Sequence, residues 1–400
     1  MPAEPKNVAI FGATGSIGQS TLDVIDQSDG AFQVWAISAH RSFADLVTAA
    51  GRHLPRYVIA SDAEAAARFD WSQLPSQTTL LTGDEALREV AAQAEVDIVV
   101  SAIVGRAGLE STLAALESGK RVALANKETL VVAGHLARRL AAEHGGEIIP
   151  VDSEHSAIFQ AIEAGRREEV ARVILTASGG PFRSLPADQL QEVTVQQALD
   201  HPTWKMGPKI TIDSATMMNK ALEIIEARWL FDLGADQIDV VVHPQSVVHS
   251  MVEFVDGSVL AQMSPPDMRL PIQLALTYPQ RLPCPAPGLD LTKAFSLDFE
   301  PPDFDRFPAL KLGKEVAQRG GTCGAVLNAA NEVAVARFLE GKIPFVDIYR
   351  ACRDVINHHH YDATPTLARL LELDAWAREE SEKWIFGSSR RVMNQAPFNS

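Results

Sequence analysis

The chain has 400 residues, and its proportions of hydrophobic residues (46%) and charged residues (22%) are those of an ordinary globular protein. This length is sufficient for two or three domains, each with a substantial core. The formal net charge of −15 at pH 7 argues against a general nucleic-acid binder, because no basic stripe offsets the acidic residues. A few local cations can still bind an anionic substrate on such a protein.

Three features bear on the cellular compartment. The three cysteines, Cys284, Cys323 and Cys352, have no metal-binding spacing, which is typical of a reducing compartment without structural disulfides. Residues 1–7 are polar and lead directly into a predicted strand, so no signal peptide is visible. Apolar runs such as 96–104 are too short to span a bilayer. We therefore expect a cytoplasmic protein with no membrane partner.

The N-terminal segment combines a strand, a glycine turn and a helix. The apolar run 7–11 is followed by Gly12-x-x-Gly15-x-x-Gly18 and then by an amphipathic segment. Glycines leave the backbone free to approach a pyrophosphate, and the exposed N–H groups of a helix N-terminus favour anions. Many glycine turns bind nothing, but this position directly after the first strand favours nucleotide binding.

Strands and helices continue to alternate through the first 150 residues. Further strands are predicted at 33–38, 56–60, 97–101, 121–125 and 147–151, and helical patterns include 107–119 and 129–144. Such a βαβ series predicts an α/β domain with a parallel, doubly wound, Rossmann-type sheet over residues 1–150.

The end of the second predicted strand indicates which dinucleotide binds. An NAD-specific site usually has Asp or Glu near this point, whereas this chain has His40, Arg41 and Ser42. The guanidinium of Arg41 can pair with the 2′-phosphate of NADP. This favours NADPH over NADH; the alternative is a solvated surface arginine.

Two carboxylates and a hydroxyl follow the strand at 147–151, in Asp152-Ser153-Glu154-His155. In an extended segment Asp152 and Glu154 point the same way, and such oxygen-rich pairs suit Mg2+ or Mn2+. The alternative is an acidic turn that caps a helix beginning near Ser156. The segment alone leaves both interpretations open.

Lys127 and Glu128 follow the predicted strand at 121–125. Residues at the carboxyl ends of strands in an open α/β sheet face the ligand crevice. Lys127 is therefore placed to polarise a carbonyl or hold a hydroxyl, and Glu128 is a plausible acid in the first turn of the next helix. The alternative for a Lys–Glu pair is a surface salt bridge.

The pattern changes after residue 150. Strands are predicted at 171–177, 238–243, 247–254 and 258–263, with helices at 155–163 and 215–232. They predict a central α+β domain over 151–285 with a mixed or antiparallel sheet, and the polar motifs within it make it the candidate catalytic domain. A proline-rich linker follows over 286–308. Helices predicted at 309–319, 324–340, 345–357 and 366–383 indicate a C-terminal helical bundle over 309–400.

A second polar cluster lies between Asp213 and Glu223. Ser214 is a candidate N-cap for the predicted helix. Asn219, Lys220 and Glu223 share one face of that helix, a mixture that is costly to bury without purpose. Glu223 could complete a metal triad with Asp152 and Glu154, while Ser214, Asn219 and Lys220 supply phosphate donors. The alternative is an exposed Lys–Glu pair.

Other polar residues are weaker candidates. Ser178 in a serine–glycine turn could bind phosphate, and the segment from His201 to Gly207, with Trp204 and Met206, resembles a loop that closes over a ligand. We expect His243 and His249 to be packed histidines, and His358–His360 to be a solvated helix end.

Assembled in order, these segments closely resemble the 1-deoxy-D-xylulose 5-phosphate reductoisomerase family. The matching segments are Gly12–Gly18, Leu124–Glu128, Val151–His155, Ser178–Arg183, His201–Gly207, Asp213–Arg228, His243–Ser250, Met268 and Leu327–Glu332. The resemblance covers residue 8 to about 340. The segment 40–42 departs from it, since relatives vary there.

The resemblance implies a role for each matching residue. Cofactor-binding residues would be Thr14, Gly15, Ser16, Ile17, His40, Arg41, Ser42, Asn126, Glu128 and Gly207. Substrate contacts would be Lys127, Ser153, Glu154, Ser178, His201, Ser214, Asn219, Lys220 and Glu223. The ligands of one divalent cation (Mg2+, Mn2+ or Co2+) would be Asp152, Glu154 and Glu223, which with Lys127 form the catalytic set.

The implied reaction is an NADPH-dependent rearrangement and reduction of 1-deoxy-D-xylulose 5-phosphate to 2-C-methyl-D-erythritol 4-phosphate, in the non-mevalonate isoprenoid pathway. The family also implies a homodimer. Two rival functions remain open at this stage: a metal-free NADPH-dependent dehydrogenase, which leaves the three carboxylates without a purpose, and a non-catalytic NADPH-binding sensor, which would tolerate their loss.

Overall fold

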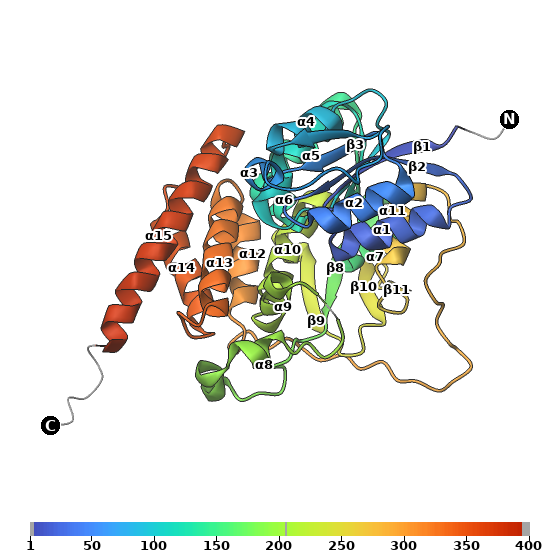
Figure 1. The fold of residues 1–400 in the computed structure, drawn as a ribbon. Coiled ribbons are helices and arrows are strands. Elements are labelled where there is room, and N and C mark those ends of the chain that lie inside the picture. Colours follow the sequence, from blue (N-terminus) through green and yellow to red (C-terminus); the bar gives the residue numbers. More distant parts are fainter. Residues whose placement is uncertain (1–3, 205, 394–400) are drawn as a thin grey trace. The chain divides into compact units, whose positions relative to one another are not determined.

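The computed structural model describes residues 4–204 and 206–393, which divide into two compact units (Figure 1). The first unit consists of Met1–Thr129, Gly134–Gln160 and Ser264–Lys293. The second consists of Leu130–Ala133, Ala161–Met263 and Ala294–Ser400. Each unit therefore draws on separate stretches of the chain.

A seven-stranded parallel sheet forms the centre of the first unit, in the order β4-β3-β2-β1-β5-β6-β7. The strands are β1 (Lys6–Phe11), β2 (Phe32–Ala39), β3 (Tyr57–Ala60), β4 (Thr79–Thr82), β5 (Ile98–Ser101), β6 (Arg121–Leu124) and β7 (Glu147–Pro150). The predicted Rossmann-type sheet is confirmed. The sequence analysis missed β4, a short edge strand with no fully buried residue and hence no apolar run.

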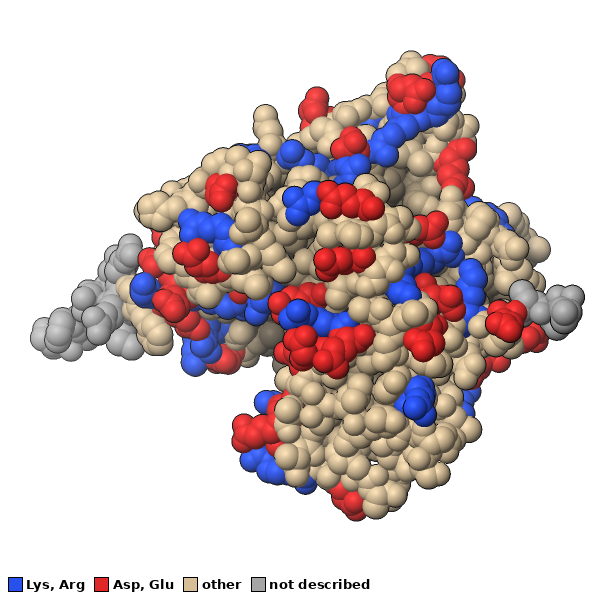
Figure 2. All heavy atoms as spheres, turned by 90° about the horizontal axis from the view of Figure 1, so that it is seen from above, with Lys and Arg blue, Asp and Glu red and all other residues tan. Residues whose placement is uncertain are grey.

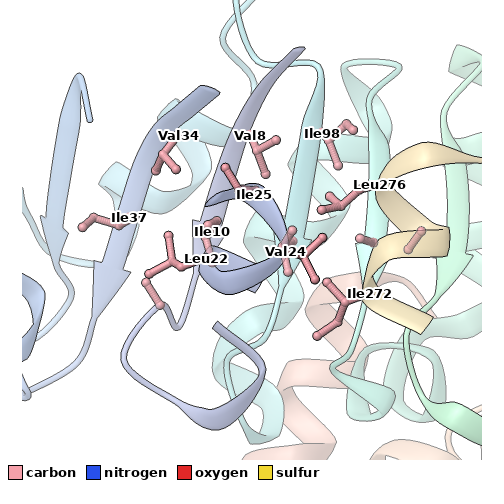
Figure 3. Close-up of a cluster of buried hydrophobic side chains, with 14 of the residues drawn as sticks. Val8, Ile10, Leu22, Val24, Ile25, Val34, Ile37, Ile98, Ile272 and Leu276 are labelled. Carbon is pink, nitrogen blue, oxygen red and sulfur yellow. The ribbon is translucent and has the colours of Figure 1, made fainter. Parts of the chain in front are cut away.

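Helices α1 (Ser16–Asp26) and α11 (Arg269–Thr277) bury one face of this sheet (Figure 3). Leu22 and Ile25 of α1 lie over Val8 and Ile10 of β1 in the same cluster. Ile272, like Leu276, reaches the cluster from α11, although α11 follows β7 by more than a hundred residues. The core of this unit is therefore completed late in the chain.

The remaining helices of this part of the chain follow the strands in order. They are α2 (Phe43–His53), α3 (Ala63–Ala66), α4 (Asp84–Ala91), α5 (Leu109–Glu117), α6 (Lys127–His144) and α7 (Ser153–Ile162). In Figure 1, α4 and α5 lie on the face of the sheet opposite to α1 and α2.

The second unit contains a four-stranded mixed sheet in the order β11-β10-β8-β9. Its strands are β8 (Val170–Ala177), β9 (Ile238–Val242), β10 (Val248–Phe254) and β11 (Val259–Met263). The pairs β8–β10 and β10–β11 are antiparallel, whereas β8–β9 is parallel. This confirms the mixed sheet predicted for the central region.

Helices surround this sheet and form the C-terminal bundle. They are α8 (Val195–Leu199), α9 (Pro208–Ala215), α10 (Met218–Phe231), α12 (Ala309–Arg319), α13 (Cys323–Leu339), α14 (Asp347–His358) and α15 (Leu367–Met393). Helices α10 and α12 pack together, and α13 packs against both α14 and α15 (Figure 1). The predicted helical bundle is confirmed.

The helix predicted at 215–232 is confirmed as α10, but it begins at Met218, after a break that separates it from α9. Met217 separates α9 from α10 with a left-handed φ of 59°, a conformation that side chains other than glycine and asparagine rarely adopt. Ser214 consequently lies inside α9 and is not the N-cap that we expected. An apolar periodicity that continues across both helices cannot reveal a break of this kind.

The proline-rich stretch between α11 and α12 has no helix or extended strand among the residues that the structure describes. The surface drawn in Figure 2 carries acidic and basic side chains in small mixed groups, in agreement with the absence of a basic stripe in the sequence. Within the described ranges, no helix is both long enough and apolar enough to cross a membrane.

Candidate active site

The glycine turn after β1 requires glycine at its two ends. Gly12 has a φ of 88°, and a Cβ atom there would approach the Ala102 carbonyl oxygen to 2.6 Å. A Cβ on Gly18 would lie 2.4 Å from the backbone of Ala13. The turn leads into the N-terminus of α1, whose N-cap is Gly15. The predicted cofactor residues Thr14, Gly15, Ser16 and Ile17 all lie at this helix start.

The next predicted cofactor segment, residues 40–42, follows β2, and its side chains contact residues that follow β3. Arg41 donates from Nε to Asp62 Oδ2 at 2.7 Å, and His40 Nδ1 lies 3.1 Å from Ser61 Oγ. The backbone N–H of Ala65 and then Arg41 hold the pKa of the Asp62 carboxyl below its usual value. Arg41 is 73% exposed and has an acidic partner that the sequence analysis missed.

The amide of Asn126 connects two loops at the sheet edge. Its Oδ1 accepts the Thr129 N–H at 2.8 Å and so caps α6, while its Nδ2 donates to the Gly105 carbonyl at 2.7 Å. Asn126 and Glu128 are both buried, and Glu128 lies in the first turn of α6 as expected. Ser42 occupies the N-cap position of α2.

Lys127 forms an ion pair with Asp152, a candidate metal ligand in the same unit. Its Nζ lies 2.6 Å from Asp152 Oδ2, and the two side chains are 8% and 13% exposed. Lys127 and Glu128 are both buried, which excludes the alternative of a surface salt bridge. A cation and a carboxylate that are both shielded from solvent attract each other more strongly than an exposed pair does.

The segment around Asp152 is not extended, which corrects the expected geometry. Helix α7 begins at Ser153, so Asp152 directly precedes it and Glu154 lies in its first turn. Ser153 Oγ donates to Glu154 Oε2 at 2.7 Å. A helix that starts in this segment and a pair of carboxylates, which the sequence presented as alternatives, are therefore present together.

In the second unit, α10 carries a buried group of polar side chains. Glu223 is 0% exposed; it accepts from Asn219 Nδ2 at 2.5 Å and forms an ion pair with Lys220. Lys220 is itself only 3% exposed. The three residues share one helix face as predicted, and burial excludes the alternative of an exposed Lys–Glu pair.

His201 connects two serines and the loop that follows it. Its Nε2 lies 3.1 Å from both Ser178 Oγ and Ser214 Oγ. Its Nδ1 accepts the backbone N–H groups of Thr203 and Trp204 at 3.2 Å and 3.0 Å. Two donors at Nδ1 assign the proton of the neutral ring to Nε2. Burial lowers the pKa of His201 below its usual value, which favours this neutral form.

The rest of the predicted loop leads into α9. The Trp204 ring is half-buried, with its centroid 6.4 Å from that of His249. Gly207 is the N-cap of α9, and its carbonyl accepts the Thr211 N–H at 3.1 Å. Residue 205 lies outside the described residues.

The remaining histidines behave differently from one another. His243 is fully buried, and its Nε2 accepts the N–H groups of Val247 and Val248 at 3.2 Å. The expected solvated helix end at His358–His360 is only partly correct, because His359 is buried. Burial lowers the pKa of His359, and its ring packs edge-on against Tyr361.

A Rossmann-type sheet with a glycine turn at a helix N-terminus is typical of dinucleotide-dependent oxidoreductases. A serine–histidine–serine cluster adds hydrogen-bond donors suited to a small anionic substrate, and the buried carboxylates are candidate ligands of a divalent cation. The fold and these groups therefore define an oxidoreductase of the dinucleotide-binding class.

Comparison with known proteins identifies the family. Three family models match: 1-deoxy-D-xylulose 5-phosphate reductoisomerase over residues 8–134, its C-terminal domain over 148–231, and the DXP reductoisomerase C-terminal domain over 263–380. The reductoisomerase of Rhodopirellula baltica is 52% identical, with 94% of each chain covered. That of Heliobacterium modesticaldum is 50% identical, with 97% of this chain and 99% of the relative covered.

Two solved structures agree with these matches. The reductoisomerase from Zymomonas mobilis in complex with NADPH is 45% identical and has a TM-score of 0.89, with 95% of this chain and 99% of that chain covered. A reductoisomerase in complex with NADPH, fosmidomycin and magnesium is 42% identical and also has a TM-score of 0.89, with 98% and 100% covered. The chain belongs to the 1-deoxy-D-xylulose 5-phosphate reductoisomerase family.

Proposed function

We propose that the residues described above carry out the reaction of this family in this chain. The chain is an NADPH- and divalent-metal-dependent oxidoreductase that rearranges and reduces 1-deoxy-D-xylulose 5-phosphate to 2-C-methyl-D-erythritol 4-phosphate in isoprenoid precursor synthesis. The single observation that best supports the assignment of residues is Glu223, a fully buried carboxylate held by a lysine and an amide. Burying such a charge is costly unless it has a specific purpose.

Asp152, Glu154 and Glu223 are the proposed ligands of one divalent cation. Their carboxylate oxygens are the hard donors that Mg2+, Mn2+ and Co2+ accept, and a related structure holds magnesium. When bound, the cation supplies Lewis-acid activation of the substrate's carbonyl and hydroxyl oxygens. Lys127, next to Asp152, would hold a substrate oxygen, and Ser153 would orient Glu154 through its hydroxyl.

The substrate phosphate would be held by donors of the second unit: Ser178, His201, Ser214, Asn219 and Lys220. His201 can donate its Nε2 proton to either serine hydroxyl. Each hydroxyl could then donate its own proton to a phosphate oxygen. A phosphate distant from the reacting carbons supplies binding energy for orientation and loop closure. Trp204 and Met206 would then exclude water during hydride transfer.

NADPH would bind mainly to residues of the first unit, with Gly207 of the second unit as a further contact. The proposed contacts are Thr14, Gly15, Ser16, Ile17, His40, Arg41, Ser42, Asn126, Glu128 and Gly207. The start of α1 suits the pyrophosphate because its backbone N–H groups point outward. Arg41 supplies the charge for the 2′-phosphate, and Asp62 orients its guanidinium.

We also propose the domain roles predicted from the sequence: 1–150 for NADPH, 151–285 for metal and substrate, 286–308 as a linker and 309–400 as a helical domain. A homodimer is proposed because β11 is an edge strand with exposed Val259 and Leu260. Three free cysteines support a reducing, cytoplasmic location.

The experiment that tests this assignment is a coupled pair of assays on Glu223→Gln. This change keeps the shape of the side chain but removes its charge. We expect NADPH oxidation with deoxyxylulose phosphate to fall by roughly a hundredfold or more, because Lewis-acid activation contributes several kcal/mol. NADPH binding, followed by cofactor fluorescence, should stay near the wild-type value. Near-normal turnover of Glu223→Gln at low magnesium would contradict the metal assignment, and wild-type turnover that resists a chelator would contradict metal dependence.

A further inference from the structure

Asn331 is a buried amide on α13. It is 0% exposed, and the residues around it on the helix, such as Ala330 and Ala334, are also buried. Its Nδ2 donates to Asp213 Oδ1 at 2.8 Å, whereas its buried Oδ1 has no hydrogen-bond partner. A half-satisfied buried amide is destabilising compared with an apolar side chain. The Asp213 contact therefore indicates a purpose other than stability.

Asp213 is held at both carboxylate oxygens. Its Oδ1 accepts from Asn331, and its Oδ2 lies 3.0 Å from Lys209 Nζ, one turn earlier on α9. The carboxylate is 1% exposed. Helix α9 packs against α13, so Asn331 is the hydrogen-bonding link between the two helices at this point. The charge of Asp213 is thereby fixed on the α13 side of α9.

The residue after Asp213 belongs to the proposed phosphate site. Ser214 Oγ lies 3.1 Å from His201 Nε2, and His201 in turn binds the backbone of Trp204 through Nδ1. Gly207, at the other end of the same loop, is the N-cap of α9. A rotation of α9 about its axis would therefore displace Ser214 and both ends of the loop together.

We propose that Asn331 is a positioning residue for the substrate phosphate. It acts through Asp213 in two ways: it fixes the rotation of the helix that presents Ser214, and it keeps a carboxylate turned away from the side where an anion binds. This inference rests on the proposed contacts of Ser214 and His201 with the substrate. Asn331 itself touches neither substrate nor cofactor in this proposal.

The test compares steady-state constants of two variants with those of the wild type. In Asn331→Ala the link is removed, and the KM for deoxyxylulose phosphate should rise about tenfold, equivalent to one lost charge-assisted hydrogen bond. The KM for NADPH should change much less, because Gly207 is the only proposed cofactor contact that adjoins α9. Asn331→Asp has the same shape but places a second carboxylate against Asp213, so its KM for the phosphosugar should rise further. The isosteric variant also tests the proposal if the alanine variant does not fold.

Asn328 provides a matched control on the same helix. It is also 0% exposed, its Oδ1 is also buried without a partner, and its Nδ2 donates to Glu332 Oε1 at 3.0 Å. Asn328→Ala should lower the Tm by an amount similar to Asn331→Ala, because both remove one buried amide. Its KM for the phosphosugar should remain at the wild-type value. An equal rise of KM in both variants would overturn the proposal, since it would show a general effect of destabilisation.

A double-mutant cycle separates this inference from the proposed function. If Asn331 acts through Ser214, Asn331→Ala should raise KM less than about twofold in a Ser214→Ala background. Full additivity of the two changes would overturn the positioning role. A normal KM in Ser214→Ala alone would instead show that the proposed phosphate site is wrong, whatever Asn331 does.

Discussion

The two lysines beside the proposed metal ligands have similar local partners. Lys127 pairs with Asp152 in the first unit, and Lys220 pairs with Glu223 in the second. In each unit an ammonium offsets the charge of a carboxylate that is largely or fully removed from solvent. A divalent cation at these carboxylates would weaken both ion pairs through charge repulsion. The lysines would then be available to substrate oxygens when the metal is bound.

Arg41 is the residue on which we base the choice of cofactor. Replacing it in Arg41→Glu puts a repelling charge where the 2′-phosphate would bind and also places two acids together at Asp62. We expect NADPH affinity to fall by about 1.5–3 kcal/mol, the value of one charge-assisted hydrogen bond, with a much smaller loss for NADH. Titration of each cofactor by fluorescence measures both changes.

Arg68 is a suitable control for this experiment. It is 71% exposed, close to the 73% of Arg41, and it also pairs with an acidic residue, Glu64. Arg68→Glu should leave both cofactor affinities unchanged. Equal losses for NADPH and NADH in Arg41→Glu would show a folding defect or a wrong contact.

His201 should contribute to the pH dependence of stability. Its pKa in the folded protein is lowered by burial, so the unfolded chain takes up a proton first as the pH falls below about 6.5. The contribution of the neutral ring is therefore fully present above that pH and is lost as the pH falls towards the folded pKa. For one proton the slope cannot exceed about 1.4 kcal/mol per pH unit.

The corresponding variant is His201→Asn. Between pH 7.5 and pH 5.5, its free energy of unfolding in urea should fall less steeply than that of the wild type. If the two proteins have the same dependence on pH, the folded histidine accepts a proton at its ordinary pKa, and the hydrogen bonds to Nδ1 do not persist in solution.

At the scale of elements, the segment from His201 to Gly207 is the part that we expect to move. Trp204 is only half-buried, and the segment is punctuated by His201-Pro202 and Gly207-Pro208. Trp204→Ala should fold with a Tm close to the wild-type value but lose transition-state stabilisation, seen as a lower kcat/KM. A tryptophan that only fills a gap in the core would instead give a lower Tm and normal kinetics.

Protease sensitivity provides an independent measurement of the same loop. Cleavage of the wild type between residues 200 and 208 should slow when a substrate analogue, metal and NADPH are present together. The same cleavage rate with and without these ligands would contradict closure. Trp204 N–H donates to His201, so a ligand that moves His201 at the serines would also move the loop backbone.

The elements that could be predicted from the sequence are those with a strong local signal. The strand and glycine turn at Gly12 and the amphipathic helices of the C-terminal bundle have such a signal. The break at Met217 does not, because methionine has no preference for the left-handed backbone that it adopts there. The short edge strand β4 was missed because it is partly exposed and its sequence has no long apolar run.

Site residues differ in the same way. Asn219, Lys220 and Glu223 are close in sequence, so helical spacing predicts that they meet. Asp62 and Asn331 were missed because their partners lie far away in the chain, at Arg41 and Asp213. The only local signal at Asn331 was an amide inside an alanine-rich helix.

At the scale of the whole molecule, the edge strand β11 predicts the oligomeric state. Val259 and Leu260 are 47% and 41% exposed, and an unpaired edge with apolar side chains can pair with a second copy. A Val259→Lys, Leu260→Lys double variant should sediment as a monomer, whereas the wild type should be a dimer at micromolar concentration. Phe386→Lys, on the 69% exposed Phe386 of α15, should remain dimeric. A monomeric wild type would contradict the proposal.

The late arrival of α11 in the chain has a consequence for synthesis. All seven strands of the first sheet leave the ribosome before Ile272 and Leu276, which cover part of its apolar face. Until then the nascent N-terminal unit exposes hydrophobic surface, and the whole of the second sheet is translated in the meantime. Such an intermediate is prone to aggregation. A nearly complete dinucleotide-binding unit therefore needs protection from aggregation, for example by chaperones. This need lasts until α11, encoded more than a hundred codons later, covers the exposed face.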